Sequence, residues 1–254
     1  SFFPQLVAGP IVRAKDFLPQ IYQKLNLTRE DVNNALFLII GGLIKKTVIS
    51  NYISINFVDR VFDTPMSYTS FENLMASYGY AIQIYCDFSG YSDMAWGIAK
   101  LLGIKINSNF NSPFISRTID EFWRRWHLSL SAWLKEYIYL PLGGRSKSQW
   151  QYMVNIFIVF FMSGVWHGAN ANYILWGSFN GLLFVMAILI GWTRGKNDIQ
   201  YGVKGFFSML LVFLSIAFTR VFFRSPDFVT ALTYYQEMFK TSDFSMPDIG
   251  VVGL

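Results

Sequence analysis

Three long apolar segments follow one another in the second half of the chain and limit its fold more than any other feature. They run from Trp150 to Trp166, from Tyr173 to Trp192 and from Gly205 to about Phe223. Each is close to the ~20 residues that a helix needs to cross a bilayer. Because the apolar runs are continuous, they do not match the short alternating strands of an outer-membrane barrel. We therefore expect an all-α, polytopic membrane protein.

The composition supports a membrane location. Hydrophobic residues make up 53% of the chain and charged residues only 15%, whereas a soluble domain carries roughly 25% charged residues. The formal net charge is +5, but the basic residues lie in short loops between apolar runs, as the positive-inside rule predicts. We therefore expect membrane lipid, and no nucleic acid, among the partners. The single cysteine, Cys86, is expected to be a small buried apolar residue.

The turn that contains His167 and Asn170 is the first candidate site. The loops on either side of its predicted hairpin, residues 145–147 and 194–204, are basic, which assigns both to the cytoplasmic side. The turn then points away from the cytoplasm or ends partway through the bilayer. A histidine at that depth is unfavourable unless it meets water, a partner or a substrate. Its neutral imidazole is suited to accept a hydroxyl proton, with a structural hydrogen bond as the alternative.

Two sets of charged residues interrupt the apolar runs of the first half. Lys45 and Lys46 lie in a helix predicted to begin after Thr28, which must change direction at a Gly-Gly pair or place the lysines at the headgroup layer. We expect them at the cytoplasmic surface, with contact to an anionic donor such as coenzyme A as the alternative. Asp87 and Asp93 lie where we predict a break between two helical pieces. They either cap that break or line a polar cavity.

A further helix is predicted from a capping box that starts at Thr118 to about Leu140. Its apolar side chains recur at three- and four-residue steps, so we expect it to be interfacial or to line a cavity. His127 lies on this helix, on the same face as Trp123 and Ser131.

Arg124 and Arg125 precede this histidine and have two interpretations. They form ion pairs with Glu121 on the helix face, or they hold an anionic donor through bidentate contacts. No metal site is expected, because two histidines and one cysteine supply too few soft ligands at any recognised spacing.

Five motifs, in order along the chain, resemble the membrane-bound O-acyltransferase (MBOAT) family. They are FFPQLVAGPIVR at 2–13, YCDFSGYSDMAWGIAKLLGI at 85–104, NFNSPF at 109–114, EFWRRWHLSLSAWLKEYIYLPLGG at 121–144 and GVWHGANANYILWG at 164–177. The segment 219–239 also fits the branch that contains bacterial alginate O-acetyltransferases together with peptidoglycan and cellulose acetylases. Because the chain begins and ends abruptly, we expect residues 1–254 to be part of one membrane-embedded domain, with further spans before and after it.

The resemblance implies a fold and an activity. The fold is a ring of tilted transmembrane and interfacial helices around a central acyl-transfer channel, in the bacterial inner membrane. The activity is transfer of an acetyl group from a cytoplasmic donor, acetyl-CoA, to a hydroxyl of an exported polysaccharide such as alginate. No tightly bound cofactor is expected, and a periplasmic acetyltransferase-like protein is the expected partner.

The resemblance assigns roles to the two histidines, and the chemistry of acyl transfer suggests roles for further residues of this chain. His167 of the WHG motif is expected to be catalytic, and His127 of the RRWH motif is the second functional position. The candidate contacts for the oxyanion or the acceptor are Asn170, Trp166 and Asp87. The residues expected to hold the phosphates of the donor are Arg124, Arg125, Lys45 and Lys46.

Other functions are open on the sequence alone. The acceptor can be peptidoglycan, or the group moved can be D-alanine, carried by a protein and transferred to teichoic acid. A different class is a non-catalytic conduit or scaffold that passes acyl groups to a periplasmic transferase, since polar residues at helix breaks serve a conduit equally well. An ion channel is less favoured, because no ring of charges or filter-like repeat is present.

Overall fold

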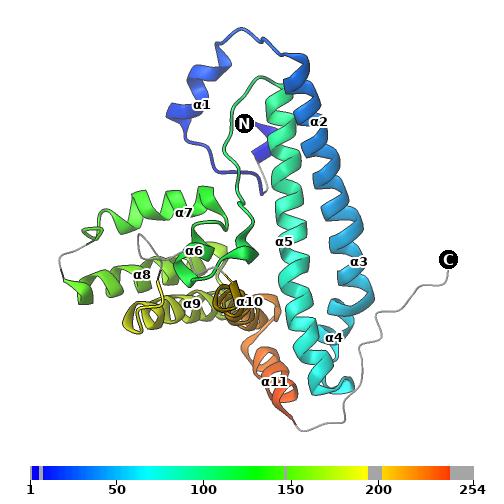
Figure 1. Cartoon of the computed structure of the whole chain (residues 1–254), viewed down its shortest axis with the longest axis vertical. Coiled ribbons are helices and arrows are strands. Elements are labelled where there is room, and N and C mark those ends of the chain that lie inside the picture. The colour runs from blue at the N-terminus through cyan, green and yellow to red at the C-terminus, as the bar shows by residue number, and fades with distance from the viewer. Residues whose placement is uncertain (1, 6–7, 146–147, 194–201, 241–254) are drawn as a thin grey trace, which may run out of the picture.

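The computed structural model describes residues 2–5, 8–145, 148–193 and 202–240, and every regular element in these ranges is a helix, as predicted. A long antiparallel pair of helices stands along the longest axis, α6 to α9 lie across it on one side, and α10 lies at the junction (Figure 1). The α-helices are α1 (Ala14–Ile21), α2 (Arg29–Leu43), α3 (Asn51–Ile53), α4 (Asp59–Asp63), α5 (Ser70–Leu101), α6 (Ile119–Trp123), α7 (Leu128–Leu134), α8 (Gln149–His167), α9 (Ala171–Leu189), α10 (Gly202–Arg224) and α11 (Phe228–Phe239). The π-helical segments are Ile44–Ser50, Ser54–Val58 and Lys135–Tyr139, and the 3₁₀ turns are Phe3–Gln5, Pro65–Ser67 and Pro113–Ile115.

The long pair begins with the helix predicted after Thr28. The Thr28 side chain accepts a hydrogen bond from the Asp31 backbone N–H, and the Asp31 carboxylate accepts one from the Thr28 N–H, both at 3.1 Å. This reciprocal arrangement is a capping box. Helical structure then continues without a break to Asp63. The chain does not change direction at the Gly-Gly pair but widens into π-helical turns that begin at Ile44.

The second helix of the pair, α5, is unbroken, so the predicted break at Asp87 is wrong. The reason lies in the neighbouring helix. Lys45 Nζ lies 2.5 Å from a carboxylate oxygen of Asp93, and Lys46 forms an ion pair with Asp87. Because the lysines satisfy these carboxylates, the backbone does not have to open at this depth. Cys86 is buried on the same helix, as predicted.

The helix predicted from Thr118 to Leu140, in contrast, is interrupted, so this prediction is wrong at its centre. Its start is confirmed, since the Thr118 hydroxyl accepts a hydrogen bond from the Glu121 N–H. The helix then ends at Trp123, and the chain resumes as α7 only after His127, whose backbone is left-handed (φ 47°, ψ 57°). Such a conformation is unfavourable for a residue with a side chain and persists only where the surroundings impose it.

A buried aromatic cluster holds this interrupted segment in place. Phe122 and Trp126 pack with Phe160 of α8, Phe184 of α9 and Ile216 of α10. Burial of large aromatic rings contributes strongly to packing free energy. The corner between α6 and α7 is therefore anchored against three helices at once.

Glycines allow two pairs of helices to approach closely. A Cβ at Gly42 of α2 would lie 2.5 Å from the Gly90 carbonyl oxygen of α5. A Cβ at Gly164 of α8 would lie 2.3 Å from the Tyr173 carbonyl oxygen of α9. Small residues at such positions are typical of helix pairs in membranes. The second contact closes the α8–α9 hairpin beside His167.

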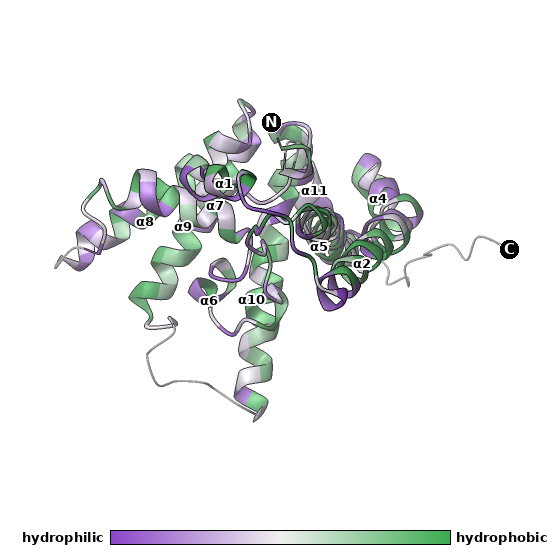
Figure 2. Cartoon of the chain, turned by 90° about the horizontal axis from the view of Figure 1, so that it is seen from above, coloured by the Kyte–Doolittle hydropathy of each residue, from purple (hydrophilic) through white to green (hydrophobic). Residues whose placement is uncertain are grey.

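The three predicted apolar segments all form helices, namely α8, α9 and α10. Among the described residues, three stretches are long and apolar enough to cross a membrane: Arg29–Asp63, α9 and α10. Figure 2 shows the apolar character of α9 and α10 along their lengths. Helix α8 is not one of the three, because polar residues near its start, such as Gln151 and Asn155, lower its hydropathy. The prediction that it spans the bilayer is therefore not confirmed, although its helical structure is.

Candidate active site

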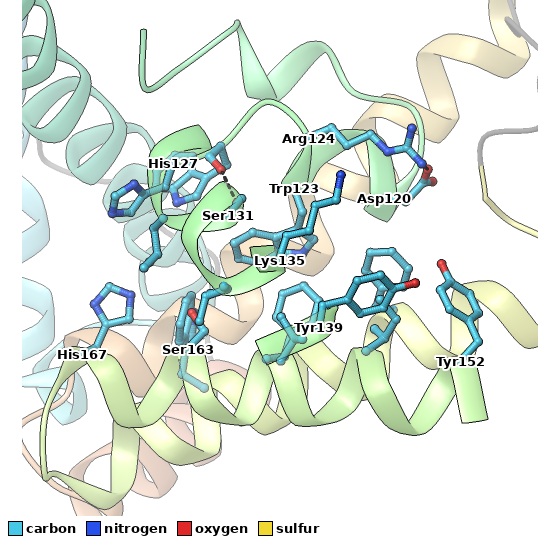
Figure 3. Close-up of a pocket in the computed structure, with 18 residues that line it drawn as sticks. Asp120, Trp123, Arg124, His127, Ser131, Lys135, Tyr139, Tyr152, Ser163 and His167 are labelled. Atoms are coloured by element: carbon cyan, nitrogen blue, oxygen red, sulfur yellow. Dashed lines mark hydrogen bonds and ion pairs between the residues drawn. The ribbon is translucent and has the colours of Figure 1, made fainter. Parts of the chain in front are cut away.

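A cavity of about 500 Å³ lies between the α6–α7 segment and α8. His127, Trp123 and Ser131 line one wall, and His167 and Ser163 line the facing wall (Figure 3). The prediction that the first three residues share a face is confirmed for the cavity, even though the helix between them is interrupted. The two histidines, 40 positions apart in the chain, meet at the same end of this cavity.

His127 is buried and held by a neighbouring loop. Its Nδ1 lies 3.2 Å from Oδ1 of Asn109, and that same Oδ1 accepts hydrogen bonds from the Ser129 backbone N–H at 3.1 Å and hydroxyl at 2.8 Å. A backbone N–H only donates, so the shared atom is the amide oxygen and His127 Nδ1 carries a hydrogen. In a neutral ring the other nitrogen, Nε2, is then a hydrogen-bond acceptor. The Leu128 N–H also donates to the Asn109 carbonyl at 3.0 Å, which explains the left-handed backbone.

His167 is the last residue of α8, and aromatic rings enclose its imidazole. The ring centroid of Trp176 lies 5.2 Å away and that of Phe223 lies 5.0 Å away, both edge-on. The helix ends here because Gly168 has φ 147°, a conformation that side chains disfavour. Trp166 contacts both imidazoles, with centroids 6.0 Å from His127 and 5.0 Å from His167. The two histidines thus occupy one aromatic environment.

Polar groups also line the far end of the cavity. Arg124 lies there beside Asp120, at 3.4 Å, with the Tyr152 hydroxyl nearby, and Lys135 lies between this end and the histidines (Figure 3). Lys135 forms no ion pair within the described part of the chain. The cavity therefore has imidazoles at one end and cations toward the other, which suits an elongated organic anion.

Several residues of this wall were not predicted as site residues. Lys135 and Tyr139 come from the π-helical segment after α7, and Tyr152 comes from the start of α8. The Trp123 indole N–H is buried and has no hydrogen-bond partner in the described ranges. The only sequence signal for this wall was the amphipathic pattern after Thr118, which predicts a helix that is interfacial or lines a cavity. Which of its polar residues face the cavity depends on the interruption at His127.

Three of the four residues predicted to bind the donor lie outside the cavity. Arg125 forms bonds of 3.1 and 2.8 Å to the Glu121 carboxylate, the ion-pair alternative, and does not line the cavity. Lys45 and Lys46 lie in the α2–α5 pair, where aspartates of α5 neutralise them. Of the four predicted cations, the structure brings only Arg124 together with the histidines. Contact of the other three with a donor stays a prediction.

The three candidate contacts for the oxyanion or acceptor also lie outside the cavity wall. The Asn170 side chain accepts a hydrogen bond from the Asn172 N–H at 2.9 Å and donates one to the Pro226 carbonyl at 2.7 Å. Its amide oxygen thus caps α9, and its amide nitrogen binds the segment between α10 and α11. Trp166 touches the histidines but is nearly half exposed, and Asp87 is paired with a lysine.

The described residues do not gather three His, Cys, Asp or Glu side chains where a metal ion could bind. The chemistry available at the cavity is that of imidazoles, hydroxyls, an indole N–H, two cations and the carboxylate of Asp120. Such groups can accept a proton, donate hydrogen bonds to a carbonyl oxygen and hold phosphates. They match the requirements of acyl transfer.

Comparison with known proteins gives a consistent result. The family model of the membrane-bound O-acyltransferases matches residues 1–200. The chain is 38% identical over 240 residues to the peptidoglycan O-acetyltransferase of Helicobacter pylori. The aligned region covers 94% of this chain and 45% of that protein. It is 34% identical over 249 residues to the probable alginate O-acetylase AlgI of Pseudomonas putida, covering 98% of this chain and 50% of that protein.

A third relative acts on a different polymer. The teichoic acid D-alanyltransferase of Bacillus subtilis is 33% identical over 197 residues, covering 72% of this chain and 48% of that protein. This chain spans about half the length of each of these relatives. The family match covers well over half of the chain and includes both histidines. The chain belongs to the membrane-bound O-acyltransferase family.

Proposed function

We propose that the chain forms the reaction site of a membrane O-acetyltransferase, which moves an acetyl group from acetyl-CoA to a hydroxyl of an exported polysaccharide. The observation that carries the proposal is the convergence of His127 and His167 on one cavity. One histidine alone has a common structural explanation. Two histidines from separate elements that face one cavity, together with cations, indicate a functional site.

In the proposed reaction, His167 is the general base. The acceptor hydroxyl loses its proton to the imidazole while its oxygen bonds to the acetyl carbonyl carbon. The carbonyl oxygen carries the negative charge of the tetrahedral intermediate. When the C–S bond breaks, the thiolate of coenzyme A leaves and takes the proton from the imidazolium. His127, through an Nε2 that is free of the Asn109 contact, orients the acceptor or shares the proton.

The donor is proposed to lie along the length of the cavity. Arg124 and Lys135 contact its phosphates near the far end, and the acetyl group reaches the histidines. The buried Trp123 N–H, which lacks a partner in the described ranges, is proposed as a donor to a carbonyl oxygen of the ligand. The predicted phosphate contact of Arg124 is kept in this arrangement, and Lys135 is added to it.

The acceptor polymer is proposed from the known proteins that the chain resembles. Acetylases of alginate and of peptidoglycan match 94–98% of this chain, whereas the D-alanyltransferase matches 72%. This difference favours acetyl over D-alanyl transfer and leaves alginate-like polymers and peptidoglycan as acceptors. We place the protein in the bacterial inner membrane, within a ring of tilted helices around a central channel, with a periplasmic acetyltransferase-like partner.

The test is His167→Ala in the intact protein, with the acetyl content of the exported polymer as the readout. We expect acetylation to fall at least about 100-fold at an equal amount of protein in the membrane. Met162→Leu, on the same helix but with an exposed apolar side chain, is the matched control and should retain wild-type acetylation. Wild-type acetylation in the histidine variant would overturn the proposal.

Two further measurements separate the alternatives. Binding of radiolabelled acetyl-CoA to membranes that contain the protein distinguishes an acetyl donor from a carrier-bound D-alanyl donor. Purified protein that hydrolyses acetyl-CoA, or forms an acetyl–enzyme adduct without partners, is an enzyme rather than a conduit. A conduit would do neither.

A further inference from the structure

Arg220 of α10 is a buried charge without a counter-ion in the described part of the chain. The residue is 2% exposed, and its Nε and Nη2 have no hydrogen-bond partner there. Arg224, one turn later on the same helix, behaves differently, because its Nη2 lies 2.8 Å from a carboxylate oxygen of Asp59. Two arginines four residues apart thus differ in whether their charge is neutralised.

The position of Arg220 relates it to the cavity. Its guanidinium carbon lies 4.1 Å from the centroid of the Trp126 ring, and Trp126 lines the cavity next to His127. Phe223, three residues further along α10, contacts the His167 ring. The unneutralised charge therefore lies behind the wall that separates α10 from the histidine end of the cavity.

Packing alone does not account for an arginine here. A charge removed from water is strongly unfavourable unless a partner neutralises it, and stacking on an indole offsets only part of that penalty. A methionine or leucine of similar volume would fill the same space without buried unpaired N–H groups. In a membrane protein, an ionisable group kept under these conditions points to function.

We propose that Arg220 stabilises the oxyanion of acyl transfer with its positive charge, acting across Trp126. The inference rests on the proposed function. As the acceptor oxygen bonds to the acetyl carbon, negative charge forms on the carbonyl oxygen, and it disappears when the C–S bond breaks. A fixed positive charge in a site of low dielectric lowers the energy of that intermediate without any proton transfer to or from the guanidinium. Arg220 does not line the cavity, so it is a positioning residue rather than a catalytic one.

The experiment compares Arg220→Met and Arg220→Lys in the intact protein, reconstituted in liposomes. Release of free thiol from acetyl-CoA gives kcat and KM, and thermal unfolding gives Tm. We expect Arg220→Met to lower kcat about 10- to 100-fold, which is less than the loss of a contacting oxyanion donor. KM should stay within about threefold, and Tm should be unchanged or higher. Arg220→Lys keeps the charge and should restore most of the lost kcat.

Arg224→Met is the matched control, and the opposite pattern is expected for it. It leaves Asp59 without its partner, so Tm should fall while kcat of the folded protein stays near that of the wild type. Wild-type kcat in Arg220→Met overturns the inference. So does failure of Arg220→Met to fold, because the fold should not need this charge. If the wild type itself shows no His167-dependent thiol release, both the proposed function and this inference are overturned.

Discussion

Two regions of this apolar chain hold charged or ionisable side chains. In one region these side chains pair with each other, and in the other they face a cavity. Between α2 and α5, Lys45 pairs with Asp93 and Lys46 with Asp87, and we call these four residues the ion-pair ladder. Between the α6–α7 segment and α8, the histidines and cations face a cavity of about 500 Å³. The ladder neutralises its charges within the protein, whereas the cavity leaves polar groups available to a ligand.

The difference shows how a functional polar residue is recognised in a membrane protein. Hydropathy alone makes every charged residue in an apolar run a candidate site. Once partners are assigned, the ladder has a structural explanation and the cavity does not. At the cavity, Lys135 has no ion-pair partner in the described part of the chain, and Arg124, although paired with Asp120, also lines the space open to a ligand.

The largest effect is expected at the cavity, for His127→Ala. Loss of a group that handles the proton or the acceptor in the transition state should lower kcat at least about 100-fold. Thiol release from acetyl-CoA by the reconstituted protein measures this. Ser70→Ala, at the start of α5 and not among the residues that line the cavity, should leave kcat unchanged. A His127→Ala variant within threefold of wild-type kcat would remove this residue from the reaction and weaken the contrast between the two regions.

A smaller effect is expected for the residue that orients His127. Asn109→Ala removes the oxygen that accepts from the ring and from the Ser129 N–H, and we expect about a tenfold lower kcat, in the range of losses for residues that orient a catalytic group. Asn109→Asp keeps an acceptor at this position and should retain more activity than the alanine variant. Equal losses in both variants would show that the left-handed backbone, not the side-chain contact, places the imidazole.

Changes in the ladder should affect stability rather than kcat. Lys46→Ala leaves Asp87 without its ion-pair partner beside a helical stretch that is apolar enough to cross a membrane, so less folded protein should accumulate. The charge exchange Lys46→Asp with Asp87→Lys should restore the amount of protein. Activity per folded molecule should stay near that of the wild type throughout. A specific loss of kcat in Lys46→Ala would return this lysine to the donor site.

The smallest effect is expected at an exposed carboxylate that belongs to neither region. Asp227 caps α11, and the hydrogen bond from the Thr230 backbone N–H, at 2.8 Å, holds the pKa of its carboxyl below the ordinary value. Its contribution to stability is therefore present above about pH 4 and is lost as the pH falls through the lowered value. Asp227→Asn should flatten the pH dependence of amide exchange in α11 below about pH 4. An unchanged dependence would contradict the role of the carboxylate.

Much of the fold follows from local pattern. The apolar segments become α8, α9 and α10, and the capping residues Thr28 and Thr118 begin helices as predicted. The two errors in helix continuity both involve partners distant in sequence. The predicted break near Asp87 does not occur because lysines 41–48 residues earlier in the chain satisfy the carboxylates. The interruption at His127 depends on Asn109, which lies in an irregular segment whose position the sequence pattern does not specify.

The candidate site was also predictable only where local sequence pattern identifies a residue. Both histidines could be named from their surroundings, and the structure brings them to one cavity. Lys135 was missed because it lies off the apolar stripe of the predicted helix, and whether it faces the cavity depends on the interruption at His127. Arg220 was missed because it lies inside an apolar segment whose length alone suggested a simple span.

The central claim is that His127 and His167 act on one acyl group in one cavity. The most direct test is kcat for thiol release from acetyl-CoA in His127→Ala, His167→Ala and the double variant. If the two act together in one step, the double variant should lose about as much as the more damaging single change, as residues that work as a unit do. If the two losses multiply in the double variant, the histidines act independently and the shared site is contradicted.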